Sequence, residues 1–108
     1  MWINTVIIGN TVPAIRIYKD LARSKELLGY RFVGYIAEQP GSNGLSSHMP
    51  YLGKLDALEP VLKDQQAEQV IVALQDTVSP NAIKELITRL GETDVEIKLV
   101  PDHLDIVS

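Results

Sequence analysis

The sequence predicts a doubly wound α/β fold: three layers, with helices on both faces of a parallel sheet. Short apolar, β-branched runs alternate along the chain with stretches of helical periodicity, which is typical of βαβ units. Two of these runs, residues 5–8 and 69–74, are almost wholly apolar, as expected for strands that are buried on both faces. The length of 108 residues, with 45% hydrophobic and 22% charged residues, fits a single globular domain spanning 1–108.

Five strands and three helices account for the pattern. The strands are expected at residues 5–8, 31–36, 51–52, 69–74 and 95–99, and the helices at residues 12–27, 56–66 and 80–91. The doubly wound layout gives the strand order 3-2-1-4-5. The last strand alternates apolar and polar residues, which is typical of a half-exposed strand near the edge of a sheet.

Helix boundaries carry recognisable signals. Thr11 is an expected N-cap of the first helix, and Gly29 closes it. Asp56 and Glu59 have the spacing of a capping box at the start of the second helix. Proline follows Ser79 at the first position of the third helix, which is a strong start signal.

The segment 37–50 is polar and contains Pro40, Gly41 and Gly44. It is therefore expected to be a loop. Its length of about 14 residues exceeds most connections in a compact domain, so it is expected to be either functional or mobile.

Composition excludes several kinds of site. The chain contains no cysteine and two histidines, so thiolate metal sites and cysteine nucleophiles are excluded and a histidine-built metal centre is not expected. The formal charge of −4 is the opposite of the basic footprint of a nucleic-acid binder. No apolar run approaches the roughly 20 residues that cross a bilayer.

A ligand site, if the chain has one, is expected where the carboxyl ends of the strands meet. The first turn carries Gly9 and Ala14 in the places of the first and third residues of the dinucleotide pattern G-x-G-x-x-G/A, but Thr11 replaces the middle glycine. A branched side chain there and the missing amide of Pro13 oppose close approach of a phosphate. The candidate binding residues at this edge are Gly9, Asn10, Thr11, Val12, Glu38 and Gln75.

The alternative to ligand binding is that these residues have only structural roles. Gly9 then serves only the tight turn, and Glu38 is a solvated loop charge rather than a ribose ligand. No catalytic or metal-binding residue is predicted. Ser46, Ser47 and His48 lack a third orienting group, and the acidic residues around His103 are interpreted as a polar terminus. Trp2 is expected at an edge or interface.

Five segments together resemble a known family. They are residues 6–9 (VIIG), 28–36 (LGYRFVGYI), 51–58 (YLGKLDAL), 68–74 (EQVIVAL) and 95–102 (VEIKLVPD). In this order they are similar to the Rossmann-like, CoA-binding-type domain of bacterial polyprenyl glycosylphosphotransferases. Those membrane enzymes start exopolysaccharide synthesis on an undecaprenyl phosphate carrier. The resemblance covers nearly the whole chain.

The resemblance implies a domain of a longer enzyme, between transmembrane helices and a catalytic sugar-phosphate transferase domain. It implies a place at the cytoplasmic face of the bacterial inner membrane and no catalytic residue within these 108 positions. The predicted strands begin and end close to the ends of the chain, so we expect an excised domain; the alternative is a small complete protein. A nucleotide, NAD(P) and coenzyme A remain alternative ligands.

Three functions follow as hypotheses. The first is a non-catalytic regulatory or organisational domain of such a transferase. The second is an NAD(P)-binding fragment of a nucleotide-sugar dehydratase, an epimerase or another oxidoreductase. The third is a dimerisation module, because the strand at 95–99 offers an unpaired edge that a second copy can extend.

Overall fold

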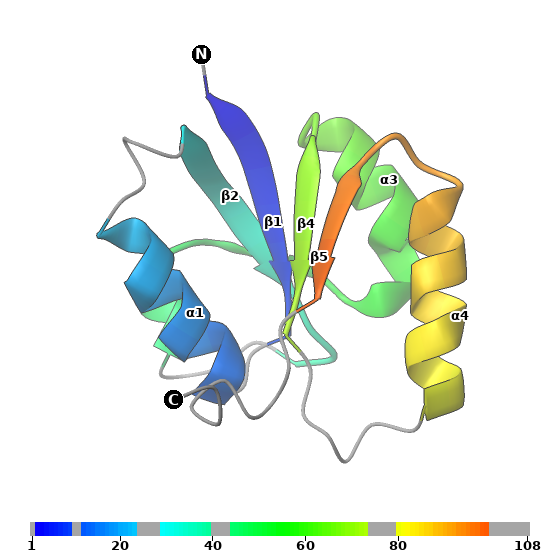
Figure 1. The fold of residues 1–108 in the computed structure, drawn as a ribbon, viewed down its shortest axis with the longest axis horizontal. Coiled ribbons are helices and arrows are strands. Elements are labelled where there is room, and N and C mark those ends of the chain that lie inside the picture. Colours follow the sequence, from blue (N-terminus) through cyan, green and yellow to red (C-terminus); the bar gives the residue numbers. More distant parts are fainter. Residues whose placement is uncertain (1, 10–11, 24–28, 40–43, 74–79, 100–108) are drawn as a thin grey trace.

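Five parallel strands form one sheet in the order β3-β2-β1-β4-β5 (Figure 1). The strands are β1 (Ile3–Ile8), β2 (Tyr30–Ile36), β3 (Tyr51–Gly53), β4 (Gln69–Val72) and β5 (Glu96–Leu99). This computed structural model describes residues 2–9, 12–23, 29–39, 44–73 and 80–99. Within these ranges the predicted fold class, strand order and three α-helices are confirmed.

Helices cover both faces of the sheet (Figure 1). On one face lie α1 (Val12–Ala22) and the 3₁₀ turn η1 (Gly44–Ser47). On the other lie α3 (Leu58–Asp64), which the 3₁₀ turn η2 (Leu55–Ala57) precedes, and α4 (Pro80–Gly91).

Two apolar cores result, one on each face, because successive residues of a strand point to opposite sides. Val6 and Ile8 of β1 face the core under α3 and α4. Ile7, between them, faces the core under α1. A continuously apolar strand therefore contributes to both cores, as its sequence predicts.

The segment 37–50 differs from the expected polar loop. Leu45, within η1, is fully buried, and Met49 is buried in the same core as α1. Their burial attaches the end of the connection to the core. The predicted loop is therefore not polar throughout, because its second half contains the 3₁₀ turn η1 and two buried apolar residues.

The predicted capping box is absent. The residues from Leu55 to Ala57 form the 3₁₀ turn, and α3 begins only at Leu58, with no side-chain cap at its N-terminus. The N-cap of α3 is Ala57, one residue later than the box requires. Glu59 lies in the first turn of α3, and its carboxylate pairs with Arg89 of α4.

A β-bulge lies between β1 and β2. Thr5 pairs with Phe32 and Val6 pairs with Gly34, so Val33 is an extra residue on β2. A Cβ atom on Gly34 would come within 2.5–2.8 Å of three side-chain carbons of Leu52. Glycine is therefore required there for close packing of β2 against β3.

Candidate functional site

The turn after β1 is the first part of the predicted ligand edge. Gly9 is buried and has a φ of 123°, a conformation that side chains with a Cβ rarely adopt. Its N–H donates a hydrogen bond to the carbonyl of Ile36, at 2.8 Å. The Gly9 amide thus extends the ladder between β1 and β2 and is not available to a phosphate.

The other predicted residues of this turn are only partly described. Val12 begins α1 and is 62% exposed. Asn10, Thr11 and Gln75 lie outside the described residues, so their place in a site stays a prediction.

Glu38 follows β2 at the same edge and is exposed. Its carboxylate accepts a hydrogen bond from the N–H of Leu55, at 3.3 Å. The end of β2 is further tied to β3, because the hydroxyl of Tyr51 donates to the carbonyl of Ala37 at 2.8 Å. Burial raises the pKa of Tyr51, and the charge of Glu38 adds to that increase. Glu38 therefore belongs to a polar contact between β2 and the β3–η2 connection.

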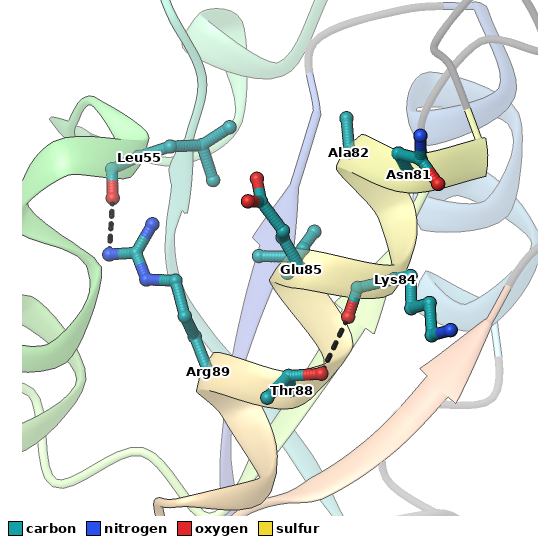
Figure 2. A pocket seen from close by; sticks show the side chains of 8 residues that line it. Leu55, Asn81, Ala82, Lys84, Glu85, Thr88 and Arg89 are labelled. Atoms are coloured by element: carbon teal, nitrogen blue, oxygen red, sulfur yellow. Dashed lines mark hydrogen bonds between the residues drawn. The ribbon is translucent and has the colours of Figure 1, made fainter.

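A groove of about 780 Å³ lies between α4 and η2 (Figure 2). Its rim consists of exposed residues of α4, among them Asn81 and Glu85, and its floor includes the buried Leu86. Figure 2 shows the Glu85 carboxylate in the space between α4 and Leu55, whereas the Lys84 ammonium points away from that space.

Arg89 closes one end of this groove. Its guanidinium donates to both carboxylate oxygens of Glu59, at 2.8 and 2.7 Å, and to the carbonyl of Leu55, at 2.9 Å. The hydrogen bonds from Arg89 lower the pKa of Glu59 to about 2. Through Nε and Nη2, Arg89 holds α4 against α3 and η2. The other charged residues that line the groove are Lys84 and Glu85.

The serine and histidine candidates do not form a catalytic group. Ser46 and Ser47 are exposed in η1, and the ring of His48 packs against Tyr18 of α1 with 4.9 Å between centroids. The described residues contain no group of acidic or histidine side chains that could hold a metal ion. Asp102, His103 and Asp105 lie outside the described residues.

The sequence did not predict the groove beside α4 or the Arg89–Glu59 pair at its end. Glu59 and Arg89 are thirty residues apart, and no local pattern links them.

Trp2, expected at an edge, is 44% exposed just before β1 and lines a small cavity with Tyr30 and Arg31. No helix within the described ranges is long and apolar enough to cross a membrane.

The sheet order, the glycine turn after β1 and the helices on both faces define a Rossmann-like, doubly wound domain. More narrowly, residues 2–101 match the family described as CoA-binding domain, and the chain belongs to that family.

The chain is similar to one curated relative and to one solved structure. The chain is 33% identical, over 93% of its length, to the UDP-glucose:undecaprenyl-phosphate glucose-1-phosphate transferase of Xanthomonas campestris pv. campestris. It spans only 21% of that relative. It also superposes on the crystal structure of RSP, a Rex-family repressor, with a TM-score of 0.67 over 98% of this chain and 57% of that one. The identity to RSP is 16%, so this likeness concerns the fold alone.

Proposed function

We propose that the chain is a non-catalytic, regulatory or organisational domain of a membrane sugar-phosphate transferase that starts exopolysaccharide synthesis on a polyprenyl phosphate. One observation carries the proposal: the 33% identity to a region of such a transferase, over nearly the whole chain. In the full protein this domain lies at the cytoplasmic face of the membrane, next to transmembrane and catalytic domains.

The geometry of the described ligand edge supports a non-catalytic role. The described polar groups at the ligand edge bond within the fold: the Gly9 amide donates to β2, and the Glu38 carboxylate accepts from Leu55. None of these residues forms the pair of acid and base that transfer of a sugar phosphate would use.

The test is an assay of the isolated chain. The purified 108-residue chain is mixed with UDP-glucose and undecaprenyl phosphate in detergent, beside the complete Xanthomonas transferase as the positive control. We expect lipid-linked product from the complete enzyme and none from the chain. Product formed by the chain alone would contradict the proposal.

A second candidate is binding of a dinucleotide or another nucleotide, which the positive φ of Gly9 at the end of β1 favours. Thermal unfolding in the presence of NAD(P), coenzyme A or a nucleotide sugar measures it. A ligand at 100 times its dissociation constant adds about 2.7 kcal/mol of stability. Thr11→Gly restores the glycine pattern and should increase the shift of a true ligand. A flat screen with both proteins excludes this candidate.

An organisational role has support of its own at the edge of the sheet. β5 is an edge strand, and its Leu99 is 57% exposed. An exposed edge that carries an apolar side chain can pair with a second copy. Sedimentation of the chain at high concentration tests this version, and a strict monomer contradicts it.

A further inference from the structure

One polar contact spans the face of the sheet that α1 also covers. The Lys98 ammonium, on edge strand β5, donates a hydrogen bond to the hydroxyl of Tyr30, the first residue of β2. Nζ lies 2.6 Å from Oη and 5.3 Å from the centre of the ring. Two strands, β1 and β4, separate the backbones that carry these side chains.

The strand register shows what lies beneath the contact. Tyr30 pairs with Ile3 of β1, and Lys98 pairs with Ile71 of β4. Between these two rows, Thr5 of β1 pairs with Gln69 of β4. Since paired residues share a face of the sheet, the line from Tyr30 to Lys98 passes over Thr5 and Gln69. The contact therefore covers both, which accounts for their exposures of 0% and 2%.

The covered pair contains an unsatisfied donor. The Thr5 hydroxyl donates to the carbonyl of Ile3, at 3.1 Å. The side-chain nitrogen of Gln69 is buried and has no hydrogen-bond acceptor. An unpaired buried amide destabilises a fold, so its presence at this place calls for an acceptor.

Lys98 lacks an anionic partner as well. Among the described residues the only salt bridge joins Arg89 and Glu59, and Lys98 is held by a neutral phenol instead. The hydrogen bond to Tyr30 raises the pKa of Lys98, and the charge of Glu96, two residues earlier on β5, adds to the increase. A charged ammonium and an amide N–H without an acceptor thus share one small region. The exposed Glu96 borders this region, because it pairs with Gln69 in the strand register, but it forms no salt bridge with Lys98.

We propose that Lys98 and Gln69 form a binding site for an oxyanion, a carboxylate or a phosphate group of a small molecule, with Tyr30 as its cover. The oxyanion replaces the Tyr30 hydroxyl as the acceptor for Lys98 and takes the N–H of Gln69. Such charge-assisted hydrogen bonds are among the strongest that proteins form.

The surroundings allow this exchange. The exposed Lys98 can swing outward on its flexible chain. Tyr30 borders a cavity of about 170 Å³ lined also by Trp2, Tyr18, Arg31 and Phe32, which gives the ring room to move aside. Tyr30 and Gln69 are the first residues of β2 and β4, away from the carboxyl edge, and Lys98 is the third of the four residues of β5.

NMR titration of the side-chain amide signals of Gln69 tests the proposal. Sodium phosphate and sodium acetate are the two probes, each titrated against sodium chloride at constant ionic strength. We expect a saturable shift with at least one probe, and which probe acts distinguishes a phosphate ligand from a carboxylate ligand. No saturable shift with either probe overturns the proposal.

Two variants and a control identify the groups involved. Lys98→Met should weaken binding by about tenfold or more, as loss of a charge-assisted hydrogen bond requires. Lys63→Met, which removes an exposed cation from α3 on the other face, should leave binding unchanged. Gln69→Leu should abolish binding, followed through the Tyr30 ring signals, and raise the melting temperature, because it removes the unpaired donor. Equal effects of the two lysine variants, or unaltered binding by Gln69→Leu, contradict the proposal.

Discussion

At the scale of single residues, Gln66 has an unusual backbone conformation. Its φ of 52° is positive, although it is not a glycine. It follows the last turn of α3, where Ala67 N–H bonds to the carbonyl of Leu62 and Gln66 N–H to that of Lys63. This is the Schellman ending, whose left-handed position glycine normally occupies. The Gln66 side chain is exposed, so the strain of the backbone is not offset by packing of that side chain.

Gln66→Gly should therefore stabilise the domain by about 0.5–1 kcal/mol, because the left-handed penalty exceeds the extra entropy of glycine in the unfolded chain. The midpoint of urea unfolding measures the change. Gln65→Gly is the matched control, since Gln65 has a right-handed conformation and glycine there should destabilise. A loss of stability in Gln66→Gly would show that this account of the turn is wrong.

The second prediction at the residue scale concerns Gly34. An added Cβ meets the Leu52 side chain at under 3 Å, so Gly34→Ala should cost about 1–3 kcal/mol through overpacking. Leu52→Ala removes the obstacle, and in the Gly34→Ala background it should cost less than it does alone. Denaturant unfolding of the four proteins gives the coupling. Strictly additive losses would mean that the two residues do not compete for space.

At the scale of secondary-structure elements, the Arg89–Glu59 pair joins α4 to α3. The pKa of Glu59 is lowered from 4.5 to about 2. A carboxyl group with a lowered pKa in the folded state stabilises fully above its unfolded pKa and loses that contribution as the pH falls through the folded pKa. The pair should therefore stabilise the domain at neutral pH and lose its effect between about pH 4.5 and 2.

Glu59→Gln measures this contribution. Because both side chains are partly exposed, at 35% and 43%, solvent screening limits the expected loss at pH 7 to about 0.5–1 kcal/mol. The difference from the unmodified protein should shrink steadily as urea unfolding is repeated towards pH 2. Glu92→Gln, at an exposed position just after α4, is the control. A difference that stays constant with pH would contradict an ionic contribution.

Most elements could be predicted from the sequence because their signals are local. The β-branched apolar runs gave β1 and β4, and proline after serine located the start of α4. The 3₁₀ turn before α3 and the burial of Leu45 could not be predicted in this way. They depend on what the neighbouring elements leave room for, rather than on their own few residues.

The position of the candidate site in the fold could be predicted from the sequence, but the groups that are free to bind a ligand there could not. Topology puts the turn after β1 at the carboxyl edge in any doubly wound sheet. Which of its groups are free depends on contacts across the sheet, such as the Gly9 amide bonded to Ile36. The Lys98–Tyr30 contact depends on the register of four strands, and no single segment of the sequence encodes that register.

At the scale of the whole molecule, the domain has a five-stranded sheet. The described polar groups at the carboxyl edge of this sheet form hydrogen bonds within the chain. Both faces of the sheet have apolar cores, and the Gly9 amide and the Glu38 carboxylate at this edge are hydrogen-bonded within the chain. This combination supports the proposal that the domain organises or regulates an enzyme.

The most direct test is to exchange the matching region of the Xanthomonas transferase for this chain and to measure transfer of glucose phosphate to undecaprenyl phosphate in membranes. We predict that the exchanged enzyme is active, whereas an enzyme that lacks the region, or carries the RSP domain of the same fold instead, is impaired. Activity that is unaffected by removal of the region, or lost when this chain replaces it in a stably folded protein, would contradict the proposed role.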